Sequence, residues 1–266
     1  MKIAIVQISS VLDPLENLKK IDHQLQLAKK EAPDLEAVFL PEVFYSITDG
    51  TQVTPYLVEE GNEHYEAIRN IAIRHNIYLL GGTATTKENG RILNRSYNFS
   101  PKGELLKFYD KIHLFAVDLK EKTKNTCIDE SRIYSSGGEL KTLDLKEFKL
   151  GLTICFDLRF PELFRKYFAM GVNVFTVSSA FTVPTGKAHW KTLLKARAIE
   201  NQSYVIACGQ WGKHNAKIET WGHSMVIDPW GEIIAECGQG EGYAICELSL
   251  ECINHIRGRL DMSSRL

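Results

Sequence analysis

The chain alternates between short apolar runs and segments in which apolar residues recur every three or four positions. A short apolar run predicts a buried strand, whereas the three-and-four spacing predicts an amphipathic helix. The predicted strands are residues 2–7, 37–40, 77–80, 149–154, 172–177 and 204–208. Predicted helices begin at Pro14 and Pro161, and two more are marked by apolar residues at 65–72 and 190–198. This alternation of strand and helix predicts an α/β fold with helices outside mixed sheets.

The first predicted helix has the clearest start signal. Asp13 can cap it, Pro14 suits the first helical position, and Glu16 follows three residues after the cap. Apolar residues from Leu18 to Ala32 then stay on one helical face. We therefore expect a helix that begins at Pro14 and packs one side against a sheet.

Other segments predict antiparallel pairing or loops. Residues 97–99 and 105–109 flank Pro101-Lys-Gly103, which predicts a hairpin, and three short strands are expected between residues 224 and 248. Residues 116–139 are polar with poor periodicity and predict a long loop. Because so many strands stand beside only four or five helices, we expect two packed sheets. No linker rich in proline, glycine or serine divides the chain, so residues 1–266 are expected to form a single domain.

Composition and charge narrow the range of functions. The chain has 32 Lys and Arg against 33 Asp and Glu, so its net charge of −1 offers no face for nucleic acid. No apolar stretch approaches the length of a membrane span, and we expect no membrane partner. The six cysteines include no CxxC pair, which favours reduced thiols in a cytoplasmic protein. Metal-ligand spacings and phosphate-binding loops are also absent from the sequence.

Three reactive residues follow predicted strands. Glu42 comes after the strand 37–40, Lys111 after the strand 105–109, and Cys155 directly after the strand 149–154. In α/β sheets, active residues gather just past the carboxyl ends of strands. Taken alone, each of the three could be a turn residue, a surface lysine or a core thiol. Their shared placement makes a common site the more interesting hypothesis.

The segments around these residues resemble the three signature segments of the nitrilase superfamily, the carbon–nitrogen hydrolases. They occur in the family's order and with similar separations. They are Leu40-Pro-Glu42, Tyr109-Asp-Lys111-Ile-His-Leu-Phe115 and Gly151-Leu-Thr-Ile-Cys155-Phe-Asp-Leu-Arg159-Phe-Pro-Glu162. Residues 179–186, 188–190, 196–201 and 221–231 are similar to the Nit branch of that superfamily. The likeness runs from residue 1 to about residue 257.

The resemblance implies a four-layer αββα sandwich, usually paired as a homodimer through its helices, and a catalytic set that needs no cofactor. On that pattern Cys155 is the nucleophile, Glu42 the general base and Lys111 the group that stabilises the tetrahedral intermediate. Glu130 matches a second family glutamate, which positions Lys111 and the substrate amide. The segment before Glu130 departs from the pattern, because residues 119–128 are Lys-rich and lack the usual Pro-Gly.

These residue types suit amide hydrolysis, in which a thiolate first forms a thioester that water then cleaves. Moving a proton from an ordinary Cys to an ordinary Glu is uphill by roughly 4.2 pKa units, or on the order of 5.7 kcal/mol. Burial of Glu42 and the positive charge of Lys111 are expected to close that gap. Lys111, with the backbone N–H of Phe156, can meet the developing oxyanion.

The resemblance also suggests the substrate. Arg159, Phe181 and Thr185 match positions that in Nit amidases hold the carboxylate of a short keto-acid amide, and a guanidinium binds a carboxylate bidentately. The expected substrate is therefore a small linear amide with a carboxylate, such as the ω-amide of a keto acid or deaminated glutathione. Arg159 could instead pair only with Glu162 or cap its loop.

Three other interpretations stay open at this point. A nitrilase would use the same catalytic set on a nitrile. A Cys–His hydrolase could combine Cys155 with His113, His189 or His223. A non-catalytic interaction module could retain the fold alone, although all three signature segments are intact.

Overall fold

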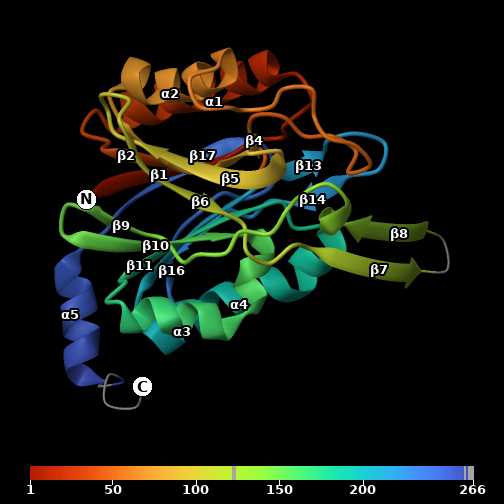
Figure 1. Cartoon of the computed structure of the whole chain (residues 1–266). Helices are drawn as coiled ribbons and strands as arrows, with labels where there is room; N and C mark the ends of the chain where they lie inside the picture. Colours follow the sequence, from red (N-terminus) through yellow and green to blue (C-terminus); the bar gives the residue numbers. More distant parts are fainter. Residues whose placement is uncertain (122–123, 261, 263–266) are drawn as a thin grey trace.

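The computed structural model describes residues 1–121, 124–260 and 262. Two mixed sheets pack face to face, with helices on both outer sides (Figure 1). The first sheet contains, in spatial order, β17 (Gly242–Glu247), β1 (Lys2–Gln7), β2 (Ala37–Leu40), β3 (Tyr78–Gly81), β5 (Arg91–Phe99) and β4 (Thr83–Glu88), with β6 (Leu105–Asp110) paired to β5. The second contains β16 (Ile233–Glu236), β15 (Met225–Ile227), β12 (Tyr204–Gly209), β11 (Val174–Ser179), β10 (Phe148–Ile154) and β9 (Thr142–Leu145).

Helices cover the outer face of each sheet. In Figure 1, α1 (Pro14–Glu31) and α2 (Glu63–His75) lie above the first sheet, and α3 (Pro161–Ala169) and α4 (Val183–Asn201) lie below the second. A further helix, α5 (Leu250–Arg259), stands at the end of the molecule that carries the N terminus. The predicted four-layer αββα arrangement is confirmed.

Strands β1, β2 and β3 of the first sheet are buried on both faces, which explains their mainly apolar sequences. In β1, Ile3 and Ile5 face the core between the two sheets, while Ala4 and Val6 face the core under α1 and α2. The predicted cap of α1 is also confirmed, because the Asp13 side chain accepts a hydrogen bond from the backbone N–H of Leu15.

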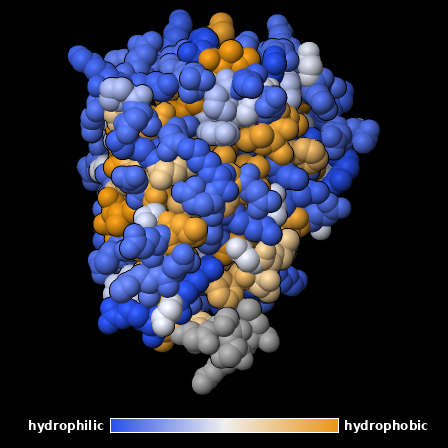
Figure 2. Space-filling view, turned by 90° about the vertical axis from the view of Figure 1, so that its left-hand side faces the viewer, coloured by the Kyte–Doolittle hydropathy of each residue, from blue (hydrophilic) through white to orange (hydrophobic). Residues whose placement is uncertain are grey.

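The outer surface is mainly hydrophilic. On the face turned toward the viewer in Figure 2, apolar residues are exposed in separate patches among polar ones. Exposed apolar side chains of this kind are normal on folded domains. None of the helices in the described part of the chain is both long and apolar enough to cross a membrane.

One sequence prediction is wrong. Residues 116–139 do not form a single loop, because β7 (Ala116–Glu121) and β8 (Lys124–Asp129) pair as an antiparallel hairpin. This hairpin extends to one side of the sandwich (Figure 1). A two-stranded ribbon is held by backbone pairing and does not require the one-sided apolar pattern of a sheet strand. A second small ribbon, β13 (Trp211–Lys213) with β14 (Glu219–Trp221), was not predicted either.

Candidate active site

A pocket lies where strands of the two sheets end. Glu42 comes two residues after β2 in the first sheet, and Cys155 directly follows β10 in the second. Both residues line the pocket, together with Glu130 from the segment after β8. The cavity measures about 120 Å³. The sandwich therefore brings a carboxylate and a thiol from opposite sheets into one small space.

The turn that carries Cys155 is unusual. Cys155 begins the short 3₁₀ helix Cys155–Arg159, and its φ of +48° is rare for a residue with a side chain. Such a conformation costs on the order of 1–3 kcal/mol and persists where the surroundings enforce it. Cys155 is 7% exposed and lines the pocket. The strained turn thus holds a mostly buried thiol at the wall of the cavity.

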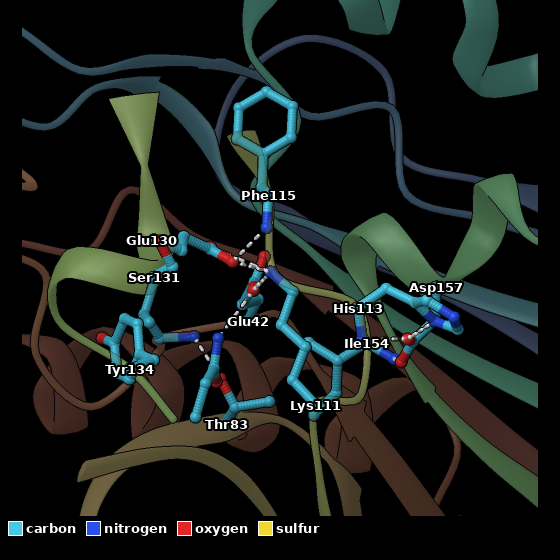
Figure 3. A network of polar contacts seen from close by, with 12 residues as sticks. Glu42, Thr83, Lys111, His113, Phe115, Glu130, Ser131, Tyr134, Ile154 and Asp157 are labelled. Atoms are coloured by element: carbon cyan, nitrogen blue, oxygen red, sulfur yellow. Dashed lines mark hydrogen bonds and ion pairs between the residues drawn. The ribbon is translucent and has the colours of Figure 1, made fainter. Parts of the chain in front are cut away.

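Lys111 lies one residue beyond β6, with its side chain fully buried. Its ammonium sits between two carboxylates (Figure 3). The Nζ atom is 2.8 Å from Oε1 of Glu42, and 2.9 and 2.8 Å from Oε1 and Oε2 of Glu130. An ammonium has three N–H groups. Two of them can donate to Oε1 of Glu42 and Oε1 of Glu130, and one remains.

Glu42 uses only one of its two oxygens inside the protein. Oε1 accepts hydrogen bonds from Lys111 Nζ and from Asn94 Nδ2, both at 2.8 Å. Within the described residues, no hydrogen bond reaches Oε2. The backbone after Glu42 is also fixed, because the N–H of Val43, whose φ is +47°, donates to Oγ1 of Thr83. Glu42 is therefore anchored through one oxygen, and the other remains available as a proton acceptor.

The hairpin β7–β8 explains how Glu130 reaches the site despite the atypical sequence before it. Phe115 precedes the hairpin and Glu130 follows it. The backbone N–H of Glu130 donates to the carbonyl oxygen of Phe115, and the N–H of Phe115 donates to Oε2 of Glu130. Because the two ends of the hairpin are bonded to each other, the extra residues project outward and Glu130 stays beside Lys111.

Burial and the charges at the site together determine the pKa of the thiol. Burial raises the pKa of Cys155 well above its ordinary value, and the Glu42 carboxylate adds to this, while the Lys111 ammonium opposes it. Burial likewise raises the pKa of Glu130, against the pull of Lys111. Burial alone would lower the pKa of Lys111, but Glu130 and Glu42 outweigh it and raise that pKa well above normal. Lys111 thus lowers the thiol pKa as expected, but burial has the larger effect and the net shift is upward.

The residues predicted to bind the substrate line the same pocket as Cys155. They are Arg159, Phe156, Phe181 and Thr185. The guanidinium carbon of Arg159 is 5.3 Å from the centre of the Phe181 ring and 5.7 Å from that of Phe156. The hydroxyl of Thr185 is already engaged, since it donates to the carbonyl oxygen of Thr182.

Arg159 has no carboxylate partner among the described residues, and the alternative pairing with Glu162 is not formed. Its two terminal nitrogens lie 3.3 Å from Nδ1 of His189 instead. An arginine held between aromatic rings and lacking an anion is well prepared to receive one.

The three histidines considered as partners of Cys155 are engaged elsewhere. Nδ1 of His113 lies 2.7 Å from Oδ1 of Asp157, and Nδ1 of His223 lies 3.5 Å from Glu236. His189 contacts Arg159. Within the described chain, no hydrogen bond joins Cys155 to any of these imidazoles, so the arrangement does not support a Cys–His pair.

Two buried residues of this site were not identified from the sequence. Asn94 holds Glu42, and Asp157 bonds to segments on both sides of the site. Asp157 lies inside the third signature segment, two residues after Cys155, which was an available signal. Asn94 is in the middle of β5, where nothing in the local sequence distinguishes it.

Comparison with known proteins places this chain in a family. The family model described as carbon–nitrogen hydrolase matches residues 2–257. The omega-amidase NIT3 of Saccharomyces cerevisiae is 34% identical over 100% of this chain and 92% of its own length. The deaminated glutathione amidase of Dictyostelium discoideum is 36% identical over 96% of this chain and 90% of its own. The crystal structure of Saccharomyces cerevisiae Nit3, a member of branch 10 of the nitrilase superfamily, covers 100% of this chain and 97% of its own, with a TM-score of 0.85 and 32% identity. This chain therefore belongs to the carbon–nitrogen hydrolase family.

Proposed function

We propose that this carbon–nitrogen hydrolase is an amidase that cleaves a small linear amide through a thioester on Cys155. The observation that carries the proposal is the buried Lys111 ammonium, held between Glu42 and Glu130, two carboxylates that line the same pocket as Cys155. The amidase names of its relatives support the same reaction type.

The first half of the reaction forms the thioester. The free oxygen of Glu42 takes the proton from Cys155, and the sulfur attacks the amide carbon. The carbonyl oxygen becomes an oxyanion, which the remaining N–H of Lys111 and the backbone N–H of Phe156 stabilise. Glu42 then gives its proton to the departing nitrogen. The carbon–nitrogen bond breaks, and ammonia or an amine leaves.

The second half releases the acid. Glu42, again a carboxylate, takes a proton from water as the water attacks the thioester, and the Cys155 sulfur leaves and is reprotonated. Glu130 keeps Lys111 in place throughout, because its carboxylate pairs with the ammonium and also accepts a hydrogen bond from the backbone N–H of Phe115. Burial raises the pKa of the Cys155 thiol, so transfer of its proton to Glu42 has to accompany the attack.

The substrate is proposed to carry a carboxylate. Glu42 and Glu130 put two negative charges against one lysine at one part of the pocket, whereas Arg159 offers an unpaired positive charge at another. An anionic substrate is repelled by the first and attracted by the second, which turns its amide end toward Cys155. The ω-amide of a keto acid and deaminated glutathione both have such a carboxylate.

We also propose a homodimer. Ile199 on α4 is 47% exposed, and Trp230 in the turn between β15 and β16 is 60% exposed. These elements are adjacent, because a side chain at Gly231 would lie 2.7 Å from Ile199. Large neighbouring apolar side chains suit burial against a second copy. Light scattering of the parent protein and of Trp230→Asp tests this: a monomeric parent contradicts the dimer.

A cytoplasmic location is proposed from the thiols. The cysteines whose side chains the structure describes are all free, namely Cys155, Cys208, Cys237, Cys246 and Cys252. Free thiols persist in reducing compartments. Fractionation of cells with an antibody to the protein tests this location.

Ammonia release from a panel of amides tests the activity. The panel contains ω-amides with and without a carboxylate, deaminated glutathione, and a nitrile matched to one amide. Hydrolysis of deaminated glutathione is measured by detecting its products. The parent is expected to hydrolyse a carboxylate-bearing amide, and Cys155→Ala is expected to have no activity. Full activity in Cys155→Ala, or turnover of the nitrile in preference to its amide, contradicts the proposal.

A further inference from the structure

Asp157 is a buried carboxylate beside the pocket that does not belong to its lining. Its side chain is fully buried, and it sits two residues after Cys155 on the same short helix. It is not among the residues that line the cavity. A charged group in such a position must be stabilised by its protein contacts, and those contacts reveal what it does.

The carboxylate bonds to both segments that carry the reactive residues. Oδ2 accepts hydrogen bonds from the Tyr109 hydroxyl at 2.7 Å and from the backbone N–H of Ile154 at 2.9 Å. Oδ1 accepts one from the backbone N–H of His113 at 3.0 Å and lies 2.7 Å from His113 Nδ1 (Figure 3). Tyr109 and His113 are each two residues from Lys111, on opposite sides of it. Ile154 is the residue before Cys155.

The hydrogen bonds to Asp157 fix the backbone on either side of the two reactive residues Cys155 and Lys111. The bond to the N–H of Ile154 fixes the end of β10 immediately before the strained φ of Cys155. The bonds to Tyr109 and His113 fix the end of β6 around Lys111. The ring of His113 is further held by stacking on Phe160, with the ring centres 3.6 Å apart. One carboxylate thus links two strand ends that belong to different sheets.

We propose that Asp157 is a positioning residue that sets the distance between the Lys111 ammonium and the Cys155 sulfur, with Tyr109 and His113 as its partners. This inference rests on the proposed function of that site. It also gives His113, in the second signature segment, a specific role: His113 orients the carboxylate that holds Cys155 and takes no proton from the thiol.

Tyr109→Phe is the most informative variant. It removes only the hydroxyl group, and with it one hydrogen bond to Asp157. Tyr167→Phe is its matched control. Tyr167 is equally buried. Its hydroxyl donates to the carbonyl oxygen of Leu152 at 2.7 Å and accepts from the backbone N–H of Lys141 at 3.1 Å, with no hydrogen bond to Asp157. Asp157→Asn is the stronger variant, since an amide leaves only one acceptor oxygen for the donors that now share two.

The first readout is kcat and KM per folded protein, with the folded fraction measured by circular dichroism. The second is the rate at which iodoacetamide alkylates Cys155. Misplacement of a reacting group by about 1 Å can cost on the order of 100-fold in rate. We expect kcat to fall about tenfold in Tyr109→Phe and about 100-fold in Asp157→Asn. KM should stay within about twofold of the parent value, because neither residue touches substrate.

Tyr167→Phe is expected to keep the parent kcat even where it lowers the melting temperature. Equal kcat losses in Tyr109→Phe and Tyr167→Phe, or no loss in Tyr109→Phe and Asp157→Asn, overturn the positioning role. Alkylation of Cys155 should be slower in Tyr109→Phe than in Tyr167→Phe, because Lys111 then assists the thiolate less. This readout needs no substrate, so an inactive parent would contradict the amidase function while the alkylation rates still decide the role of Asp157.

Discussion

The Nζ atom of Lys111 lies 2.8 Å from Oε1 of Glu42, and both side chains are buried. A buried ion pair is expensive to desolvate and contributes little net stability by itself. Glu130, on the other side of the same ammonium, adds a second buried carboxylate to the cluster. Such a concentration of charge next to a free thiol is costly for folding and has its clearest explanation in catalysis.

Glu42→Gln tests the general base. The amide keeps the size of the side chain and can still meet Lys111, but it cannot take a proton from Cys155. We expect kcat/KM for the best amide to fall about 10²–10⁴-fold, the usual contribution of a positioned base. Glu232→Gln, an exposed change in the turn before β16, is the control and should leave kcat/KM unchanged. A loss of less than about tenfold in Glu42→Gln would contradict the assigned role.

Lys111→Met tests the electrostatics through stability. The variant leaves two carboxylates buried without their cation, so we expect the free energy of unfolding at pH 7 to fall by roughly 3–5 kcal/mol. Burial raises the folded-state pKa of Glu130, and the variant removes the Lys111 charge that opposes this rise. The destabilisation should therefore be small below about pH 4 and grow as the pH rises through the folded-state values. Urea titrations at several pH values measure this, and a pH-independent loss would argue against charge as its cause.

The pH profile of kcat/KM should have a displaced acid limb. Burial and Glu42 raise the pKa of Glu130, so the pair of carboxylates accepts its first proton above the ordinary value of 4.5. Activity is therefore expected to fall as the pH drops through that raised pKa. It should not fall between neutral pH and about pH 9, since the pKa values of Cys155 and Lys111 are both raised. In Glu130→Gln the acid limb should move to lower pH, and an unmoved limb would exclude coupling between the carboxylates.

Arg159→Lys tests the carboxylate site. The ammonium keeps the charge but loses the bidentate geometry of the guanidinium. For a carboxylate-bearing amide we expect KM to rise about tenfold or more, the effect of about 1.4 kcal/mol in binding. For an uncharged amide of similar length KM should change little. Equal increases for the two substrates would mean that Arg159 only supports the fold.

His223→Asn tests the alternative hypothesis that His223 is the base for Cys155. The imidazole of His223 stacks on Trp221, with ring centres 4.5 Å apart, and its backbone carbonyl accepts a hydrogen bond from Trp190. The variant keeps that carbonyl, so we expect a modest loss of stability and nearly full kcat. Inactivation of His223→Asn together with an active Lys111→Met would reverse the assignment of the base.

The layered fold was predictable because the strands of a sandwich are buried on both faces. Apolar runs such as 37–40 and 149–154 therefore stand out, and they correspond to β2 and β10. The hairpin at 116–129 was missed because its two strands are polar in sequence. They are paired through their backbones, which leaves no apolar pattern to detect. Helix α5 was missed as well: only Ile253 and Ile256 of its ten residues are buried, too few to produce a helical pattern.

The reactive residues were predictable, but their electrostatic state was not. Strand ends and family-like segments pointed to Glu42, Lys111 and Cys155. The net pKa of a thiol depends on burial and on several charges at once, and a sequence gives neither distances nor burial. The role of Asp157 was hidden for the same reason, since its partners Tyr109 and His113 lie more than forty positions away along the chain.

Intact-mass spectrometry of an acid-quenched reaction tests the central claim most directly. During turnover of a carboxylate-bearing amide, the parent protein should gain the mass of the acyl group, and peptide mapping should place it on Cys155. Glu42→Gln mixed with the same amide should show much less adduct at equal times. An acyl group on another residue, or efficient turnover in a protein whose Cys155 has been replaced by alanine, would contradict the thioester mechanism.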